Sequence, residues 1–413
     1  MTPATYIDTH ANELAALLGD LVRMPTVNPP GENYDAITAR LTTELKTAGL
    51  QARRLPVPAA ACRAVLPREQ WHHPRWNVLG RLRERGAKRT LHFNAHYDVV
   101  PVSGNWIHGG PFSGARAGGR VYGRGTADMK GSMASLLVAL RALRACGVQP
   151  ALNIEVSFTA DEETDSALGA GWLVRHAPLE PDYAVVMEGG EGHRVCCGHN
   201  GVVWLEVTVR GRAAHGSRPD KGINAFEKMA ALALALKEHG RELARRHFVT
   251  PEGETMRPTL NIGGVFGQGP GGKINTVPAE ATFSIDRRVL AIETVASAER
   301  ELRTFLREAA RRIPRCHIEV RKVSDNHPCF SEPTHPFFGT MAEIVGRVRR
   351  KPAVFSVSTG FNDMHFFAHH LKIPTLGYGP GGAGCHAVNE HASLRELVAS
   401  AKIYAELMTR FRG

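Results

Sequence analysis

The chain has 413 residues, of which 43% are hydrophobic and 22% charged, as is typical of a globular protein large enough for more than one domain. No apolar run approaches the roughly 20 residues that span a bilayer, and the N-terminus does not resemble a signal peptide, so we expect no membrane association. The formal net charge of +11 is spread through helices without a nucleic-acid motif, so we expect no nucleic-acid partner. Seven scattered cysteines predict a reduced, cytoplasmic protein.

Strand-like and helix-like segments alternate through the first half of the chain. An amphipathic pattern of leucines predicts a helix near residues 14–22. The segments that follow are, in order, the strand TLHFNA, the helix GSMASLLVALRALRACG, the strand LNIEVSF, the helix LGAGWLVRH and the strand YAVVME. This alternation predicts an α/β layer with a mostly parallel central sheet.

Longer strands with strict alternation begin near residue 199. They read GVVWLEVTVRG, TLNIGGVFG, EATFSIDRRVL and HIEVRKV, and helices are predicted over residues 223–240 and 293–312. This pattern is typical of a small α+β sandwich covered on one face.

The α/β pattern returns after about residue 325. A helix over residues 336–348, the strands AVFSV and IPTLGYG, and a final helix from about residue 393 complete the chain. The simplest organisation is an α/β domain made of residues 1–198 and 323–413, interrupted by an inserted α+β domain of residues 199–322.

Histidines and acids lie just beyond the carboxyl ends of the predicted strands, where open α/β sheets bind ligands. Asp128, in GRGTADMKG, instead lies at the start of a predicted helix, whose N-terminus favours negative charge. Each of these residues alone is better explained as a surface residue, but their joint placement predicts a zinc site with nitrogen and oxygen ligands. The candidates at the strand ends are His96, Asp98, Asp161, Glu162, Glu163, Glu188 and His386.

Three adjacent acids follow the strand NIEVSFT, and adjacent carboxylates repel each other unless a cation compensates. A metal supplies that compensation. With a shared carboxylate, such a site holds two ions about 3.5–4 Å apart. Only one of Glu162 and Glu163 needs to bind metal, and the other can serve as general base. Asp161 has no catalytic role in this scheme and is predicted to support the turn.

At these residues the sequence resembles the zinc amidohydrolase and exopeptidase family of acetylornithine deacetylase, succinyl-diaminopimelate desuccinylase, aminoacylase and carboxypeptidase G. The resemblance implies a di-zinc exopeptidase-like catalytic domain interrupted by an inserted ferredoxin-like lid and dimerisation domain. The similar stretches keep the family's order and span nearly the whole chain: MPTVNPPGENY, NAHYDVVPV, GRGTADMKG, TADEETDS, VVMEGG, GRAAHGSRPDKGINA, GGKINTVPAEA and GCHAVNE.

The resemblance also implies which residues hold the two zinc ions. His96, Asp128 and Glu188 would hold one ion. Asp128, Glu163 and His386 would hold the other, with Asp128 as the bridge. Co²⁺ and Mn²⁺ are alternatives, because they suit similar ligands.

The remaining catalytic roles come from the same resemblance. Asp98 would orient His96, Glu162 would be the general base, and a cis peptide is expected after Asp128. His215 of the inserted domain would reach the active site of the neighbouring subunit and polarise the scissile carbonyl.

Three further positions match substrate-binding residues of the family. Asn275 and Arg287 would bind a substrate carboxylate, and Gly360 would line the pocket. Arg288 is an adjacent alternative, because strand alternation lets only one of the two arginines face the cleft. The family usually dimerises through a strand edge and a helix of the inserted domain, and residues 202–209 are the candidate strand.

The expected reaction is hydrolysis of the amide bond of a small N-acyl amino acid by a zinc-activated water. The same centre also suits a dipeptidase or carboxypeptidase, a deaminase of related mechanism, or a non-catalytic relative that binds such ligands. GQGPGGKI resembles a phosphate loop, but Ile274 replaces the required Ser or Thr and Pro278 argues against the following helix. No G-x-S-x-G is present, and Cys385 is expected to be a small packing residue beside His386 rather than a nucleophile.

Overall fold

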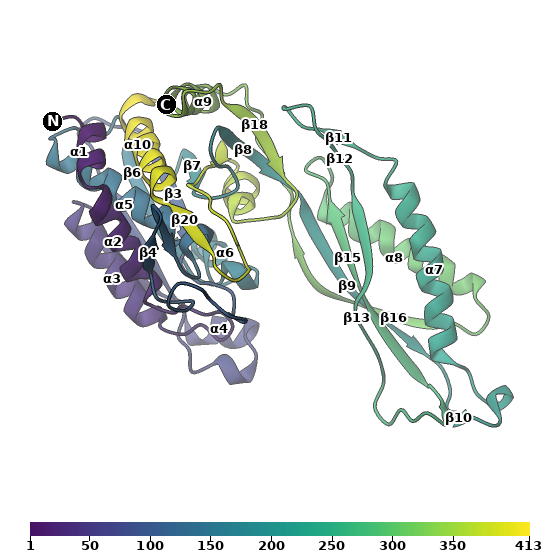
Figure 1. Ribbon diagram of the computed structural model, residues 1–413. Helices are drawn as coiled ribbons and strands as arrows, with labels where there is room; N and C mark the ends of the chain where they lie inside the picture. Colours follow the sequence, from purple (N-terminus) through teal and green to yellow (C-terminus); the bar gives the residue numbers. More distant parts are fainter. The chain divides into compact units, whose positions relative to one another are not determined.

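The computed structural model describes residues 1–413 and divides into two compact units. The first unit comprises Met1–Cys197, Ser331–Ser356 and Asn362–Gly413, and the second comprises Gly198–Phe330 and Val357–Phe361 (Figure 1). Along the sequence the second unit therefore interrupts the first. Its main segment ends at Phe330 rather than near residue 322, because the last long strand continues to Asn326.

A mixed sheet lies at the centre of the first unit, with the strand order β1-β2-β6-β3-β7-β19-β8. The four strands β6, β3, β7 and β19 are parallel, whereas β1, β2 and β8 pair antiparallel with their neighbours. The parallel arrangement expected from the sequence thus holds for the centre of the sheet, where the candidate ligands follow the strands. The bounds are β1 Gln51–Pro56, β2 Trp76–Leu82, β3 Thr90–His96, β6 Asn153–Thr159, β7 Tyr183–Val186, β8 Arg194–His199, β18 Val354–Ser358 and β19 Thr375–Gly377.

Helices of the first unit bury their apolar faces against this sheet and against one another. α5 is buried along nearly its whole length, because α2 and α10 pack against it. It ends before Gly147, which has a positive φ of 63° that an L side chain rarely adopts. No helix in the chain is long and apolar enough to cross a membrane. The bounds are α1 Pro3–Thr9, α2 Ala11–Val22, α3 Tyr34–Thr47, α4 Ala59–Val65, α5 Gly131–Ala145, α6 Ala170–His176, α9 Pro336–Arg349 and α10 Leu394–Arg410.

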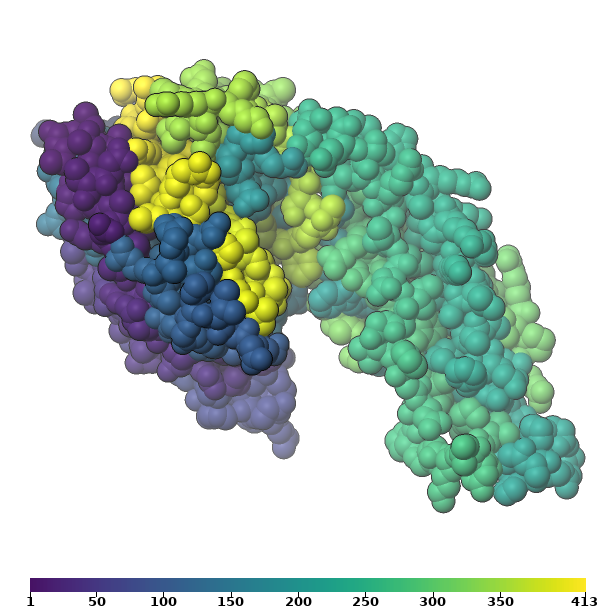
Figure 2. Space-filling view, viewed as in Figure 1, coloured from purple at the N-terminus to yellow at the C-terminus, as the bar shows by residue number.

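A small three-stranded sheet joins the end of the first unit to an early segment of the chain. β20 (His391–Ser393) pairs with β5 (Arg120–Tyr122), and β5 pairs with β4 (Ala115–Ala117). Figure 2 shows the same relationship, since yellow C-terminal residues lie directly against the blue segment. This pairing brings the loop after β19 next to the turn that carries Asp128.

The second unit is a four-stranded antiparallel sheet with the order β13-β15-β9-β16. Alternate residues of β9 and β15 are buried against α7 and α8, which matches the predicted sandwich covered on one face. The bounds are β9 Gly201–Arg210, β13 Thr259–Gln268, β15 Glu280–Val289, β16 His317–Asn326, α7 Ala225–Leu243 and α8 Val295–Arg312, with the short strands β10 Ala214–His215, β11 Phe248–Val249, β12 Thr255–Met256, β14 Thr276–Val277 and β17 Cys329–Phe330.

The strand expected to form a dimer edge is not an edge. Residues 202–209 lie in β9, which pairs with β15 on one side and with β16 on the other. The backbone groups of β9 are therefore already used within the sheet, and β13 and β16 are its edges.

Candidate metal centre

The five candidate ligands converge at one edge of the central sheet. His96 is the last residue of β3, and Glu163 and Glu188 follow β6 and β7. His386 lies in the loop after β19, and Asp128 lies in the turn before α5. Because β3, β6, β7 and β19 are parallel, their carboxyl ends meet at the same edge, as the sequence indicated.

Asp128 lies between the two histidines. Its Oδ1 is 2.9 Å from Nε2 of His96, and its Oδ2 is 3.3 Å from Nε2 of His386. Nε2 of His386 is also 3.1 Å from Oε2 of Glu163. Ligand atoms of His96, Asp128 and Glu163 all lie within 4.8 Å of one another. One carboxylate thus presents an oxygen to each histidine, the arrangement that a bridging ligand requires. The peptide bond after Asp128 is cis, as expected.

Glu188 supplies the clearest sign that a cation belongs here. Its Oε1 is buried and has no hydrogen-bond partner. Burial, followed by the nearby Asp128 carboxylate, raises the pKa of Glu188 well above its ordinary value. A buried carboxylate oxygen without a partner is costly, and a divalent cation removes that cost. The residues present therefore fit a metal centre with nitrogen and oxygen ligands.

The pKa values of the neighbouring acids Glu162 and Glu163 are raised for the same reasons, burial and nearby negative charge. Burial and then neighbouring Glu188 raise the pKa of Glu162 well above its ordinary value. Burial also raises the pKa of Glu163, although a hydrogen bond from His386 opposes the rise. Such crowding of partly buried carboxylates at one sheet edge is expected at a site built for positive charge.

Asp98 fixes the turn that carries the two glutamates. Its Oδ1 accepts a hydrogen bond of 3.2 Å from the backbone N–H of Glu162, and its Oδ2 accepts one of 3.2 Å from that of Glu163. Nδ1 of His96 lies 3.1 Å from the backbone oxygen of Asp98 and 3.4 Å from its Oδ1. Asp98 therefore lies where it can orient His96, and the backbone oxygen is the closer acceptor.

Glu162 lies beside the histidine that ends β3. Its Oε2 is 3.8 Å from Nε2 of His96, and its side chain is only 12% exposed. Glu162 and Glu163 belong to one short 3-10 turn, Glu162–Thr164, so their carboxylates are held on a common support.

Asp161 is buried and has a structural role. Its carboxylate accepts hydrogen bonds from Nε of Arg75 at 2.7 Å, from the hydroxyl of Tyr34 at 2.9 Å and from Nδ2 of Asn28 at 3.1 Å. Asn28 also donates to Oδ2 of Asp98 at 2.9 Å, which links the two aspartates. These three hydrogen-bond donors were not predicted from the sequence. Asn28 and Tyr34 lie in the family-like stretch MPTVNPPGENY, whereas no motif or periodic pattern marks Arg75.

His215 and Asn275 lie together in the second unit. His215 is in β10, which pairs with β14, and the backbone oxygen of Asn275 accepts a 2.7 Å hydrogen bond from the N–H of Gly216. Both residues are exposed, and Nδ1 of His215 is 2.8 Å from the hydroxyl of Ser217. A predicted catalytic residue, His215, and a predicted substrate-binding residue, Asn275, therefore share one exposed end of this unit.

The placement of Arg287 contradicts its predicted role. Arg287 is fully buried on the face of β15 that packs against α7 and α8, and its Nη2 donates to Oε1 of Glu293 at 2.9 Å. Its guanidinium is therefore occupied inside the core of the unit and is not free for a substrate carboxylate. Arg288 points to the opposite face, is partly exposed, and lies 3.1 Å from Oδ2 of Asp286. The alternation that favours one arginine over the other selects Arg288.

Gly360 and Cys385 complete the predicted positions. Gly360 lies in the Val357–Phe361 segment of the second unit, and its N–H donates to the hydroxyl of Ser358 at 3.2 Å. Sγ of Cys385 is 3.2 Å from Oδ2 of Asp128, and the residue is exposed. Although the residue as a whole is exposed, partial loss of water around its sulfur and the nearby Asp128 carboxylate raise the pKa of this thiol. The shift disfavours the thiolate that a nucleophilic cysteine needs.

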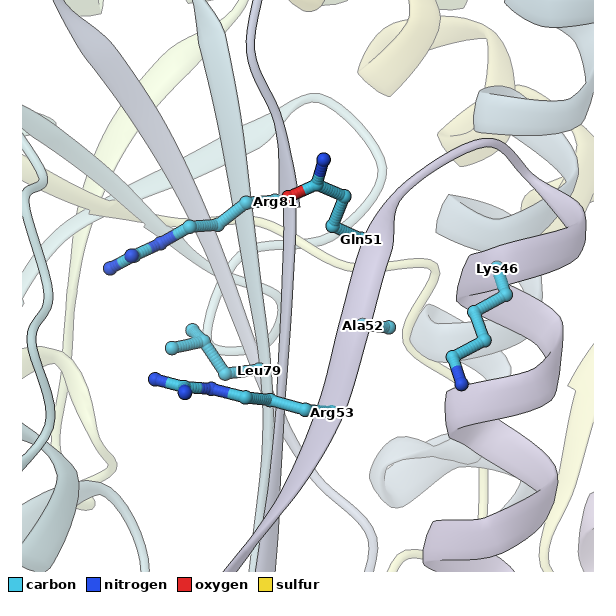
Figure 3. A pocket seen from close by; sticks show the side chains of 6 residues that line it. All are labelled: Lys46, Gln51, Ala52, Arg53, Leu79 and Arg81. Carbon is cyan, nitrogen blue, oxygen red and sulfur yellow. The ribbon is translucent and has the colours of Figure 1, made fainter.

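Two cavities clarify the setting of the centre. A cavity of about 370 Å³ in the first unit is lined by Asp128 and Glu188 among others, so it opens directly onto the candidate ligands. A separate cavity of about 510 Å³ lies around strand β1, where Arg53 and Arg81 point to the same side and Lys46 comes from α3 (Figure 3). None of the candidate ligands lines this second cavity, so it is not part of the metal centre.

The phosphate-loop-like stretch GQGPGGKI does not precede a helix. It covers the end of β13 and the loop that follows, and the next element is the short strand β14. A phosphate loop needs a helix N-terminus after it, so the structure agrees with the exclusion of this motif.

Comparison with known proteins agrees with this geometry. The family model described as peptidase family M20/M25/M40 matches residues 92–410. A succinyl-diaminopimelate desuccinylase of Methylobacterium radiotolerans is 29% identical over 414 residues, with 98% of both chains covered. An acetylornithine deacetylase of Photorhabdus laumondii is 27% identical over 402 residues, with 96% of both chains covered.

A solved structure, the M20 family metallo-carboxypeptidase Sso-CP2 of Sulfolobus solfataricus, is similar with a TM-score of 0.77 at 20% identity. The similarity covers 96% of this chain and 98% of that one, and it extends the likeness in fold to both units. Since the family model matches well over half of the sequence, the chain belongs to peptidase family M20/M25/M40 and is a metallohydrolase that acts on amide bonds.

Proposed function

We propose that this enzyme hydrolyses the amide bond of a small N-acyl amino acid, as a deacetylase or desuccinylase does, with Glu162 as general base. One observation carries the proposal. Two consecutive residues of a single turn lie beside the two different histidines of the centre. The Glu163 carboxylate is 3.1 Å from the ring of His386, and the Glu162 carboxylate is 3.8 Å from the ring of His96. A metal ligand and a general base on one turn keep a fixed position relative to each other.

Two zinc ions are the proposed cofactors. His96, Asp128 and Glu188 would hold one ion, and Asp128, Glu163 and His386 would hold the other. When bound, such a pair acidifies water in the site and polarises the substrate carbonyl. The unpaired Oε1 of Glu188 and the two-sided placement of Asp128 support this donor set. Co²⁺ or Mn²⁺ would suit the same ligands.

Glu162 handles the proton in the proposed reaction. Its carboxylate takes a proton from the attacking water and later delivers it to the leaving nitrogen. Because its side chain is only 12% exposed, bulk water has little access to the proton between the two transfers. His215 would donate a hydrogen bond to the oxygen of the carbonyl under attack.

Arg288 and Asn275 are proposed to bind a carboxylate of the substrate. Arg288 replaces Arg287 in this role, because Arg287 is buried and paired with Glu293. The planar guanidinium can bond both carboxylate oxygens, which favours substrates with a free carboxylate. Gly360 remains a proposed pocket residue.

A homodimer through the second unit is also proposed. β13 is an edge strand with Val265 and Phe266 both 73% exposed, and the neighbouring helix α7 exposes Leu234. An edge strand whose outer side is unpaired and carries exposed apolar side chains is a surface that favours pairing with another chain. In such a dimer, His215 would serve the site of the neighbouring subunit. All seven cysteines are free, which fits the proposed cytoplasmic location.

A dipeptidase or carboxypeptidase is the second candidate, because a likeness of fold to a metallo-carboxypeptidase covers nearly the whole chain. The same ligands and the same base would serve it. A related deaminase would instead release ammonia.

A substrate screen separates these candidates. N-acetyl amino acids, N-succinyl amino acids and dipeptides are offered to the purified chain with and without a chelator, and ammonia release is followed in parallel. We expect cleavage of N-acyl amino acids that the chelator abolishes and that added zinc restores. Cleavage of dipeptides alone would contradict the deacylase, and ammonia release without a freed acyl group would favour the deaminase.

A further inference from the structure

The ligand His386 sits at the end of a closed loop. Residues Ala383 and His391 bridge each other through two backbone hydrogen bonds of 3.0 Å, so the residues between them form a narrow loop. His386 lies within it, with a side chain 52% exposed. Its Nε2 contacts Asp128 and Glu163, and the position of its backbone depends on what holds the two ends of the loop.

Glu390 anchors one end of this loop, because its carboxylate accepts hydrogen bonds from the turn that carries Asp128. Its Oε1 accepts hydrogen bonds from the backbone N–H groups of Gly125 at 3.0 Å, Ala127 at 2.8 Å and Asp128 at 3.1 Å. Its Oε2 accepts a hydrogen bond of 2.5 Å from Nη1 of Arg124. The carboxylate is completely buried, and its bonds to Arg124 and Gly125 are buried with it, whereas those from Ala127 and Asp128 are partly buried.

The backbone continues the same attachment. The N–H of Gly123 donates a hydrogen bond of 2.9 Å to the backbone oxygen of Glu390. The next residue, His391, begins β20, which pairs antiparallel with β5 starting at Tyr122. The segment that ends in Asp128 and the segment that begins after His386 are thus fastened along several consecutive residues. Among these attachments, the hydrogen bond from the N–H of Asp128 to the Glu390 carboxylate is the one that involves the ligand residue itself.

We propose that Glu390 is a positioning residue for the metal centre, which fixes the His386 loop and the Asp128 turn as one unit so that two of the three ligands of the second ion, Asp128 and His386, are held in place before the metal binds. The inference rests on the metal centre of the proposed function. Groups that orient metal ligands typically contribute roughly 10- to 100-fold to metal affinity.

Glu155 provides a matched control. It is also a buried carboxylate paired with an arginine, since its Oε2 lies 2.7 Å from Nε of Arg81. Its other oxygen is 2.9 Å from Nδ1 of His92, and it touches neither the Asp128 turn nor the His386 loop. Glu155→Gln therefore imitates the loss of a buried charge without loosening the link between the ligands.

The test measures zinc binding by the full-length chain. Metal-free wild type, Glu390→Gln and Glu155→Gln are titrated with Zn²⁺ against a competing chelator, and with Co²⁺ followed by its visible absorption. Thermal midpoints are recorded for all three. We expect Glu390→Gln to bind zinc roughly 10- to 100-fold more weakly and to give an altered Co²⁺ spectrum. Glu155→Gln should lower the thermal midpoint and keep the wild-type zinc affinity.

Arg124→Gln supplies a second variant for the case in which Glu390→Gln does not fold. It removes the partner of Oε2 and leaves the three backbone bonds to Oε1 in place. It should weaken zinc binding in the same direction by a smaller factor. When Arg124→Gln is combined with Glu390→Gln, two neutral amides face each other and no buried guanidinium is left without its carboxylate, so part of the lost affinity should return.

The results that overturn the inference are distinct from failure of the proposed reaction. Wild-type zinc affinity in Glu390→Gln or in Arg124→Gln, with only a lower thermal midpoint, would reduce Glu390 to a structural residue. Equal losses of affinity in Glu390→Gln and Glu155→Gln would do the same. A wild type that binds zinc but cleaves no amide refutes only the proposed reaction, whereas a wild type that binds no metal refutes both.

Discussion

Nε of Arg75 lies 2.7 Å from Oδ2 of Asp161, and both side chains are almost completely removed from solvent. The pair stands directly behind the turn of Glu162 and Glu163, and Asn28 connects Asp161 to Asp98. The third acid of the cluster is thus paired with an arginine, whereas Glu162 and Glu163 are left for their proposed roles as base and metal ligand.

Breaking this pair should strongly destabilise the first unit. Arg75→Met leaves the Asp161 carboxylate buried without its cation, and loss of one partner of a buried pair costs about 3–5 kcal/mol in unfolding free energy. Adding Asp161→Asn should recover much of the loss, because the neutral amide can still accept hydrogen bonds from Tyr34 and Asn28. Urea unfolding followed by circular dichroism measures both effects. Strictly additive losses in the double variant would mean that the two residues are not energetically coupled.

The adjacent glutamates should have separable roles. Glu162→Gln removes the proposed base and should lower kcat by about 100- to 10,000-fold while zinc content stays at the wild-type level. Glu163→Gln removes a proposed ligand and should lower zinc content as well as turnover. Steady-state kinetics and metal analysis of the same preparations test both. Full activity of Glu162→Gln would refute its role, and full zinc content of Glu163→Gln would refute the ligand.

The adjacent arginines form a second matched pair. Arg288→Ala should raise KM for substrates with a free carboxylate and change stability little, because its contact with Asp286 is partly exposed. Arg287→Ala should cost about 3 kcal/mol in unfolding free energy, because Glu293 loses its buried partner. Kinetics and urea unfolding of both variants decide the assignment. A raised KM in Arg287→Ala without loss of stability would restore Arg287 as the substrate residue.

Subunit mixing should reveal whether His215 acts across the proposed dimer. Neither His215→Ala nor Glu162→Gln alone should turn over substrate at an appreciable rate. A dimer with one subunit of each kind contains one complete site if His215 serves its neighbour. Co-expression of the two should then restore about a quarter of the wild-type rate, since half of randomly paired dimers are mixed and each has one working site. No recovery in purified mixed dimers would place His215 at the site of its own chain.

Acid should weaken the second unit through His239. This residue lies in the core with its ring stacked on Phe305 at 4.2 Å, and its Nε2 has no hydrogen-bond partner. Burial lowers its pKa, against the opposing influence of nearby Glu301 and Glu242. The folded state therefore favours neutral imidazole, so its contribution to stability is present above the unfolded pKa of about 6.5 and is lost as pH falls through the lower folded value.

His239→Phe should flatten that dependence. Unfolding free energies measured between pH 5 and 7.5 should fall with acid in the wild type and fall less in the variant. Parallel pH profiles for the two proteins would show that His239 is not responsible.

Much of the metal centre could be predicted from the sequence because parallel strands deliver their carboxyl ends to one place. The alternation of Ile154, Val156 and Phe158 identified β6, and the acids after it could then be assigned to the sheet edge. The bounds of β3 and α5 followed from equally regular patterns.

The choice between Arg287 and Arg288 could also have been made from the sequence. Arg287 shares its parity with Phe283, Ile285 and Val289, which is the parity of the buried face of β15. Arg287 instead matches a carboxylate-binding position of the family, and a buried partner such as Glu293 is invisible in a strand pattern.

Contacts between distant segments could not be predicted. Arg75 lies outside the family-like stretches, and Glu390 ends the stretch GCHAVNE without any sign in the sequence of its partners; each contacts a residue far away in the chain. The position of β9 within its sheet could not be predicted either, because the same alternation is expected for a half-buried strand at an edge and for one in the interior.

The distance between Arg124 and Glu390 along the chain, 266 positions, also bears on the order in which the protein is made. During synthesis His96, Asp128, Glu163 and Glu188 leave the ribosome before the whole insertion, and His386 leaves only after it. At ordinary rates of translation the interval between Glu188 and His386 is roughly 10–40 s. Until then the crowded carboxylates lack both the last proposed histidine ligand and the carboxylate proposed to align it, so stable loading with metal would have to wait until the segment that carries His386 and Glu390 has been made.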